Sequence, residues 1–333
     1  MRKLPVGSVP TFCLLVLLAA ACRKKQDEPA VRYVAVIPKG TTHEFWKSVH
    51  AGALKAASEL KTADGAAIRI EWKGPAREDD RDAQIKVVED FVTRRFAALV
   101  LAPLDDRALV GPCIDAKEIG IPVVIIDSGL QWDGSTSFVA TDNRRGGSLG
   151  AERLGGVLGG KGKVLLLRYQ EGSASTSERE AGFLETMKAK FPAIELVSTD
   201  QYGGATAETA LQAMENLLGR FPQLDGIFAP NESTTFGTLR ALEGAGRVAS
   251  TKLVGFDASA PLVDALKAGK IQGLVVQNPF RMGELGVKAA VDAIDHKPVE
   301  KRIDTGCVVA TPENLATPEI DAALHPPVEK WLK

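Results

Sequence analysis

The alternation of short apolar segments with longer amphipathic ones, which begins at Val31, constrains the fold of this chain more than any other feature. Segments 33–37 and 122–126 carry apolar residues on both faces, as strands buried in a parallel sheet do. Segments such as 44–60 instead place apolar residues along one helical stripe. This order predicts an α/β fold in which a doubly wound parallel sheet is covered by helices on both faces.

The same rhythm starts again after Thr141, so the sequence predicts two such α/β domains. The predicted strands are 33–37, 68–72, 98–101, 122–126, 137–140, 164–167, 195–198, 226–229, 253–256 and 273–276. The predicted helices are 44–60, 80–94, 107–119, 143–158, 177–191, 205–218, 234–243 and 261–268. Ligands of open parallel sheets bind beyond the carboxyl ends of the strands. Two sheets that face each other therefore predict a cleft lined by residues just past each strand.

The chain opens with the organisation of a secretory signal. A short cationic head, Arg2 and Lys3, precedes an apolar run at 12–21. This run is too short for a stable transmembrane helix. Residues 1–21 are therefore predicted to be a signal peptide that directs export and is then removed.

The end of this signal, residues 18–22, resembles a bacterial lipobox, in which cleavage precedes a cysteine that carries lipid. On this interpretation Cys22 anchors the mature chain to a membrane, on its periplasmic or cell-surface side. The polar residues 22–31 then form a flexible tether. The alternative is an ordinary signal cleaved near Ala21, which would leave a soluble exported protein.

Charge and cysteine content exclude several partners. The formal net charge is −1, which lacks the basic excess expected of a nucleic-acid-binding surface. Cys113 and Cys307 remain once the signal is removed and Cys22 is lipidated, and we expect them to be free thiols. The histidines have no metal-ligand spacing with these cysteines, so no metal site is predicted.

No catalytic motif in the chain has the context that it needs. Residues 155–161 resemble a phosphate-binding loop, but Gly162 stands where Ser or Thr is required. Residues 146–150 fit the pattern of a hydrolase nucleophile elbow, but the later histidines, His296 and His325, lie in polar or proline-flanked stretches. We therefore predict neither an enzyme nor a bound cofactor.

Six segments at or just past the predicted strands occur in an order that resembles the ribose- and galactose-type periplasmic binding proteins of bacterial ABC transporters. They are Phe45-Trp46, 124–127, 140–143, 228–232, 254–257 and Val276-Gln277. The resemblance spans about residues 31–306. It implies two doubly wound domains joined by three crossovers, the type I periplasmic-binding-protein fold. It also implies a monomer that captures a sugar or related polyhydroxylated molecule between its domains and delivers it to an ABC permease.

The resemblance implies roles for two aromatic and two acidic residues. Phe45 and Trp46 match the aromatic pair that stacks on a sugar ring in this family, and the alternative for either is a position in the core. Asp127 and Asp257 each close an apolar strand, where a carboxylate that accepts from two hydroxyl groups of a ligand is satisfied. The alternative for Asp257 is a helix N-cap.

Two further polar residues and two departures from the family complete the predicted site. Asn231 and Gln277 can both donate and accept hydrogen bonds, as hydroxyl ligands require. Ser128 and Ser177 stand where the family has arginines, so the sequence predicts that both guanidinium contacts are missing. Arg168, His43 and Glu44 are the candidates to replace these contacts, and Tyr202 is a candidate for a third aromatic surface. A sugar, a polyol, a sugar acid and a nucleoside-like ligand all stay open.

The implied crossovers define the hinge and the lobes. The predicted hinge residues are Thr141, Asp142, Gln277, Asn278 and Asp304. They divide the chain into an N-terminal lobe, 32–141 plus 278–304, and a C-terminal lobe, 142–277 plus 305–333. A helix around 284–294 would then belong to the N-terminal lobe.

Three other functions were weighed against transport. A sensory binding protein would present the same closed form to a chemoreceptor or kinase, and the sequence does not separate the two. The effector domain of a repressor shares the fold but needs a DNA-binding helix pair at the N-terminus, where this chain carries an export signal. A hydrolase would need the catalytic constellation that the motifs above lack.

Overall fold

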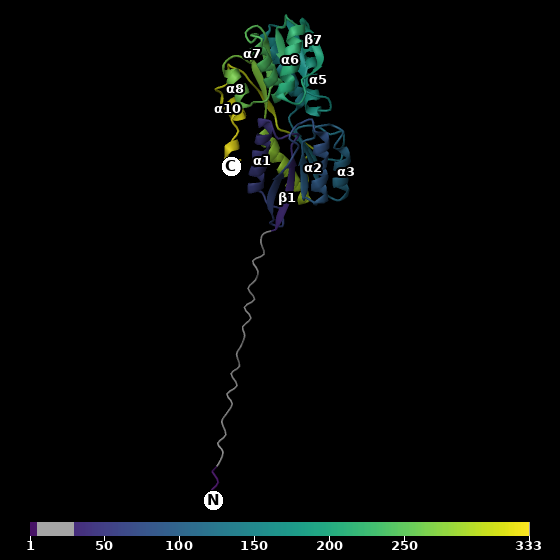
Figure 1. The fold of residues 1–333 in the computed structure, drawn as a ribbon, viewed down its shortest axis with the longest axis vertical. Helices are drawn as coiled ribbons and strands as arrows, with labels where there is room; N and C mark the ends of the chain where they lie inside the picture. Colours follow the sequence, from purple (N-terminus) through teal and green to yellow (C-terminus); the bar gives the residue numbers. More distant parts are fainter. Residues whose placement is uncertain (5–29, 333) are drawn as a thin grey trace.

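Two six-stranded sheets organise the computed structural model, which describes residues 1–4 and 30–332. The domains built on them lie one above the other in Figure 1. The rest of the predicted signal peptide, Cys22 and most of the tether lie outside the described residues. Within the described part, no helix is long and apolar enough to cross a membrane.

The two sheets have the same strand order. The sheet of the N-terminal lobe runs β11 (Arg302–Asp304), β5 (Ser137–Ala140), β4 (Val123–Ile126), β3 (Ala98–Leu101), β1 (Val31–Ile37) and β2 (Ala67–Trp72). The sheet of the C-terminal lobe runs β12 (Cys307–Ala310), β10 (Gly273–Gln277), β9 (Lys252–Phe256), β8 (Gly226–Phe228), β6 (Gly162–Arg168) and β7 (Ile194–Tyr202). All neighbours pair in parallel except β12, which is antiparallel to β10.

Helices connect successive strands and cover both faces of each sheet. They are α1 (Glu44–Glu59), α2 (Arg81–Thr93), α3 (Val110–Glu118), α4 (Asn143–Val157), α5 (Ala174–Lys190), α6 (Ala207–Arg220), α7 (Glu232–Gly244), α8 (Ala260–Lys267), α9 (Pro279–Ile294), α10 (Pro318–Leu324) and the short 3-10 helix η1 (Val328–Lys330).

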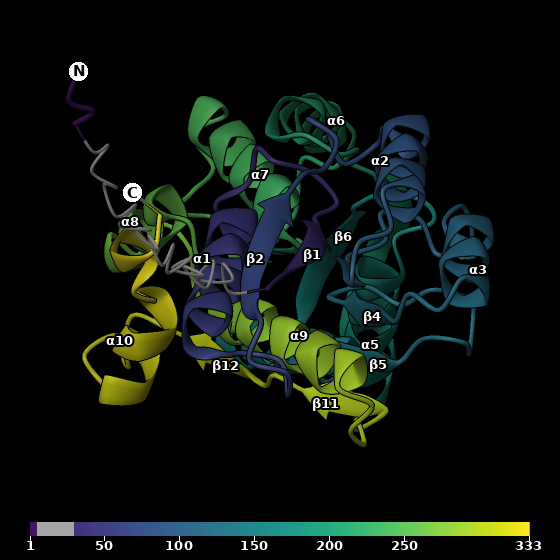
Figure 2. The same ribbon diagram turned by 90° about the horizontal axis from the view of Figure 1, so that it is seen from below.

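Alternate side chains of the N-terminal sheet point to opposite faces. Val34 and Val36 of β1 pack with residues of α1 and α9, whereas Ala35 and Ile37 pack with residues of α2 and α3. Figure 2 shows these two helix pairs on opposite sides of β1 and β2. Because both faces are covered, the strands have the continuous apolar runs that the sequence displays.

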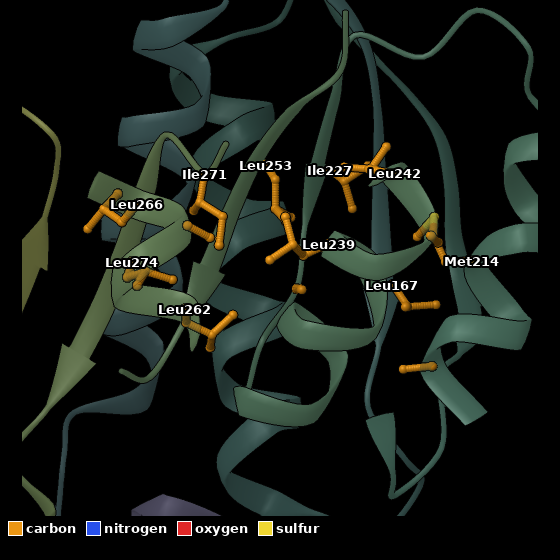
Figure 3. Packing of buried hydrophobic residues seen from close by; sticks show 14 of the residues in the cluster. Leu167, Met214, Ile227, Leu239, Leu242, Leu253, Leu262, Leu266, Ile271 and Leu274 are labelled. Carbon is orange, nitrogen blue, oxygen red and sulfur yellow. The ribbon is translucent and has the colours of Figure 1, made fainter. Parts of the chain in front are cut away.

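The C-terminal sheet follows the same plan. Ile227 and Leu253 belong to the core shared with α6, α7, α8 and α10, part of which Figure 3 shows with Leu239 of α7. Val164 and Phe228 belong to the opposite core, shared with α4 and α5. Each lobe therefore has two apolar layers, one on each side of its sheet.

One pair of helices in each lobe packs with its backbones in close contact. α1 and α9 approach each other at Gly52 and Gly283, and α4 and α5 approach at Gly147 and Gly182. A Cβ atom at Gly52 or at Gly147 would lie 1.8 Å from a carbonyl oxygen of the partner helix. Only glycine fits these contacts, which hold α4 and α9 against their sheets.

The chain passes between the two sheets three times, between β5 and α4, between β10 and α9, and between β11 and β12. Two of these crossings touch, because Thr141 Oγ1 lies 3.3 Å from Thr305 Oγ1. The N–H of Asp142 also donates to the Asp304 carboxylate at 3.2 Å. Asp142 and Asn278 cap the helices that follow, α4 and α9.

The structure confirms the predicted fold class, two doubly wound parallel-sheet domains joined by three crossovers. It adds β11, β12, α10 and η1, which the sequence analysis did not predict. β7 runs from 194 to 202, beyond the predicted 195–198, because it is an edge strand with alternating polar residues. Helix α5 begins at Ala174, three residues before the predicted start, and this shift matters for the site.

The two cysteines of the described region lie on different lobes. Cys113 is buried in α3, and Cys307 is partly buried in β12. Both are free thiols. Burial raises the pKa of Cys113 to about 12 and, with smaller contributions from nearby charges, that of Cys307 to about 11. Neither thiol is therefore activated as a nucleophile.

Candidate ligand-binding cavity

A cavity lies where the carboxyl ends of the two sheets face each other, and 14 residues line it. The space between these side chains that no protein atom fills is about 330 Å³, and part of it is open to solvent. The N-terminal lobe contributes Lys39, His43, Phe45, Trp46, Glu78 and Asp127. The C-terminal lobe contributes Tyr169, Ser175, Thr176, Arg179, Asn231, Glu232, Asp257 and Gln277.

Asp127 follows β4 directly and forms a buried ion pair. Its carboxylate lies 2.9 Å from Lys39 Nζ, which comes from the loop after β1. Lys39 also donates to Ser175 Oγ at 2.9 Å, so this pair joins the two lobes. Asp127 has a φ of 61°, a left-handed conformation that residues other than glycine seldom adopt. Such strain often accompanies a functional side chain.

Glu78, from the loop after β2, accepts hydrogen bonds from both lobes. His43 Nδ1 lies 2.6 Å from its carboxylate, and Trp46 Nε1 and Tyr169 Oη each donate to it at 2.7 Å. Burial alone would lower the pKa of His43, but the Glu78 carboxylate outweighs burial and raises it. Burial in turn favours the protonated form of Glu78, yet His43 and Lys39 together lower its pKa. The pair is therefore ionised.

Arg179 of α5 lines the cavity and is buried. Its Nε donates to Asn143 Oδ1 at 2.8 Å, and its Nη1 donates to the carbonyl of Pro230 at 2.9 Å. Its guanidinium lies 4.1 Å above the ring of Phe256, and its Nη2 is 4.0 Å from Asp127. The guanidinium is thus held in one orientation, a condition for selective recognition of hydroxyl groups.

Asp257 follows β9 and lies in the left-handed region with a φ of 67°. Its carboxylate accepts from Gln277 Nε2 at 2.7 Å and from the backbone N–H of Glu232 at 3.1 Å. Burial raises the pKa of Asp257, although Arg179 lowers it in part. The alternative that Asp257 is a helix N-cap is wrong, because the N-cap residue of α8 is Ser259.

Glu232, the first residue of α7, caps a helix of the opposite lobe. Its carboxylate accepts from the backbone N–H groups of Glu44 at 3.4 Å and Phe45 at 3.2 Å, at the start of α1. Burial raises the pKa of Glu232 to about 7, with His43 opposing and Asp257 adding to the shift. Near neutral pH this carboxyl group changes its charge with small changes in its surroundings.

The predicted aromatic pair lies at the start of α1 and lines the cavity. Phe45 and Trp46 pack edge to face, with ring centroids 4.9 Å apart. Trp46 is also part of the core of its lobe, and its stacking on a sugar ring stays a prediction. Asn231 likewise has two roles, because it lines the cavity and its side chain caps α7 through the N–H of Thr234.

Seven of the twelve predicted ligand contacts line the cavity and five do not. The seven are His43, Phe45, Trp46, Asp127, Asn231, Asp257 and Gln277. Ser128 is buried behind Asp127, where its Oγ accepts from the N–H of Ser175. Glu44 is exposed beside the cavity and pairs with Lys47.

Three of the five lie farther away. Arg168 is paired with Glu180 at 2.6 Å, and its guanidinium covers the exposed ring of Tyr202. Ser177 lines a separate surface pocket. The prediction that the cavity lacks both guanidinium groups is corrected, because Arg179 lines it. Two residues along a helix are about 200° apart, so Ser177 points away where Arg179 points in.

Sequence reasoning missed seven lining residues, which are Lys39, Glu78, Tyr169, Ser175, Thr176, Arg179 and Glu232. Lys39 stands two residues past β1, and Tyr169 one residue past β6. The rule that ligands bind past strand ends would have found both. Glu78 lies in a loop with no pattern of its own, so no signal in the sequence points to it.

The described residues hold no group of three or more His, Cys, Asp or Glu side chains that could bind a metal ion. Hydrogen bonds from Lys39, Tyr169 and Phe45 each cross from one lobe to the other around the cavity. The arrangement suits a neutral or charged ligand rich in hydroxyl groups, held by both lobes at once.

Comparison with known proteins finds matches among periplasmic binding proteins. The family model described as a periplasmic binding protein domain matches residues 34–298. A D-ribose/D-allose-binding protein of Pseudomonas aeruginosa is 29% identical over 95% of this chain and 98% of its own length. A ribose import binding protein of Bacillus subtilis is 30% identical over 68% of this chain and 72% of its own.

The solved structures that this chain resembles are also solute-binding proteins of transporters. A carbohydrate transporter solute-binding protein from Agrobacterium radiobacter, in complex with D-arabinose, matches with a TM-score of 0.84 and 32% identity, covering 89% of this chain and 99% of that one. An ABC transporter solute-binding protein from Agrobacterium vitis with bound D-fucose matches with a TM-score of 0.83 and 36% identity, covering 88% and 100%.

Proposed function

This chain belongs to the periplasmic binding protein family, of the ribose and galactose type, and from that premise we propose that it captures a sugar or related polyhydroxylated molecule and delivers it to an ABC importer. Its relatives are sugar-binding transport proteins and not enzymes. One observation carries the proposal: a cavity between two lobes is lined by buried carboxylate, amide and guanidinium groups beside an aromatic pair.

In the proposed mechanism, a ligand binds one lobe first and then stabilises the closed form by contacting the other. The bonds from Lys39 to Ser175 and from Tyr169 to Glu78 form only when the lobes meet. We assign the hinge to the three crossings, at Thr141-Asp142, Gln277-Asn278 and Asp304. The lobe boundaries predicted from the sequence follow from that assignment, and the division of strands between the sheets supports it.

The closed monomer would then present both lobe rims to the permease. Family membership supports a periplasmic location, and a lipid on Cys22 would keep the protein at the membrane. A Cys22→Ser variant should lose lipid labelling and move from the membrane fraction to the soluble fraction. Retention of the label by the variant would rule out this anchor.

A thermal-shift screen of the mature chain against sugars and polyols tests the binding function. A ligand present at 100 times its Kd should stabilise the fold by about 2.7 kcal/mol. Asp127→Ala and Asp257→Ala should each abolish that shift, because each removes an acceptor from one side of the cavity. Calorimetry that finds undiminished affinity in both folded variants would remove these residues from the site, and a ligand seated elsewhere would overturn the proposal.

A further inference from the structure

The charges that line the cavity do not balance. Four carboxyl groups face three cationic groups, namely Glu78, Asp127, Glu232 and Asp257 against Lys39, His43 and Arg179. Lys39 neutralises Asp127, and His43 neutralises Glu78, at 2.9 Å and 2.6 Å. Arg179 is therefore the one lining cation without a close carboxylate partner, since Asp127 lies 4.0 Å from its Nη2. Arg179 and His43, which acts on Glu232 from a distance, face two carboxyl groups.

The carboxyl groups without a close cationic partner, those of Asp257 and Glu232, both belong to the C-terminal lobe. Asp257 is bonded to two neutral groups, the amide of Gln277 and the backbone N–H of Glu232. The Glu232 carboxylate is bonded to two backbone N–H groups of α1. A buried carboxylate that has neutral partners only is costly unless a counter-ion reaches it.

A third acceptor at the same place has no partner at all. Gln277 is 2% exposed, and its Oε1 has no hydrogen-bond partner among the described residues. The amide orientation is set by the other end, because Nε2 donates to Asp257. Gln277 Oε1 is therefore an unpaired acceptor next to Asp257. Buried acceptors are seldom left unpaired, so we expect the ligand to supply a donor here.

We propose that the ligand carries a protonated primary amine, as in an amino sugar or an amino polyol, and that this group binds between Asp257, Glu232 and Gln277 Oε1. An ammonium group has three N–H donors and no acceptor, which matches three acceptors, and its positive charge would stabilise the ionised forms of Glu232 and Asp257 that burial disfavours. A hydroxyl group supplies one donor and no charge. This inference rests on the proposed function and narrows it to a ligand class.

Calorimetry with matched pairs tests the inference. The probes are D-glucosamine, D-galactosamine, D-mannosamine and 1-amino-1-deoxysorbitol, each compared with its neutral parent and, for the three sugars, with its N-acetyl derivative. In at least one pair the amine should bind tenfold or more tighter than the parent, and acetylation should remove that advantage. If every parent that binds does so as tightly as its amine, the inference fails and the proposed function stands.

If neither member of any pair binds to the folded protein, the inference fails, and the proposed function is then decided by the thermal-shift screen alone. Two variants add a readout that a structural role would not move. Glu232→Gln and Asp257→Asn should lower the ratio of amine to parent affinity by tenfold or more, whatever they do to closure. The control Glu208→Gln removes an exposed carboxylate near His43 and should leave the ratio unchanged. An equal ratio in all three variants would overturn the proposal.

Discussion

The two lobes place an aspartate at the cavity with the same backbone design. Asp127 follows β4 and Asp257 follows β9, the strands at the same position of the two sheet orders. Each has a positive φ, 61° and 67°. The N–H of Asp127 donates to Val139 of β5, and that of Asp257 donates to Val275 of β10. The repeated fold thus delivers two carboxylates to one cavity from opposite sides.

Their electrostatic surroundings differ sharply. Asp127 has a lysine ammonium at 2.9 Å, whereas the nearest partners of Asp257 are an amide and a backbone N–H. The comparison teaches that a repeated topology sets where a carboxylate lies and not whether it is neutralised. Neutralisation depends on single side chains such as Lys39, which differ between the lobes.

The largest effect on stability is expected when the ion pair between Lys39 and Asp127 is broken. Lys39→Met removes the ammonium and leaves the Asp127 carboxylate buried without its partner, so the free energy of unfolding should fall by about 3–5 kcal/mol. Urea unfolding of the ligand-free protein measures it. Lys47→Met, which removes an exposed lysine paired with Glu44, should change stability by less than about 1 kcal/mol. Equal losses in the two variants would contradict the comparison.

A smaller effect should be shared by the lobes, because their helix packing does repeat. Gly147→Ala and Gly283→Ala each place a Cβ within 2.0 Å of a backbone oxygen on the facing helix. Each should lower the free energy of unfolding by about 1–3 kcal/mol, as overpacking does.

Gly156→Ala is the matched control for these two changes. Gly156 lies in α4, where an added Cβ meets nothing within 4 Å. This variant should gain up to about 1 kcal/mol, because alanine favours a helix over glycine. Urea unfolding measures all three variants. If only one of Gly147→Ala and Gly283→Ala lowers the free energy of unfolding, the two lobes share their strand order but not their close helix packing.

The smallest effect on the free energy of unfolding is expected at Asp257, whose hydrogen-bond partners are both neutral. Asp257→Asn should change stability at pH 7 by less than about 1 kcal/mol, because the amide keeps an acceptor for Glu232 N–H and can donate to Gln277 Oε1. Burial raises the folded-state pKa of Asp257. Its stabilising contribution is thus present below the unfolded pKa and is lost as pH rises through the folded pKa.

The stability of Asp257→Asn relative to the natural chain should accordingly increase with pH. The charged groups that act on Asp257 are Arg179 and Asp127, and Asp257 in turn acts on Glu232 and His43. Thermal unfolding between pH 4 and pH 8 checks the trend, with Glu208→Gln as a surface control. A relative stability that falls with pH would show that Asp257 is well neutralised after all.

Most of the fold could be predicted from the sequence, because its elements have a local period. The strands at 33–37 and 122–126 and the helix at 44–60 are where the pattern indicated. β11 was missed because its three residues alternate exposed and half-buried positions and contain no apolar run. β12 does have a short apolar run, which the sequence prediction left unassigned. The start of α5 was misplaced by three residues, which left Ser175 and Thr176 outside the predicted helix. Arg179 was missed because the resemblance assigned the family's arginine position to Ser177, two residues earlier.

The sequence by itself determined two α/β domains and the strand ends at which polar side chains gather, because burial on both faces of a sheet leaves a local, readable pattern. Only the tertiary structure decided which of those side chains meet. Glu78 joins His43 to Tyr169, and Lys39 joins Asp127 to Ser175, across as many as 136 positions of the chain. Charge pairing acts through space, and no periodicity along the chain records it.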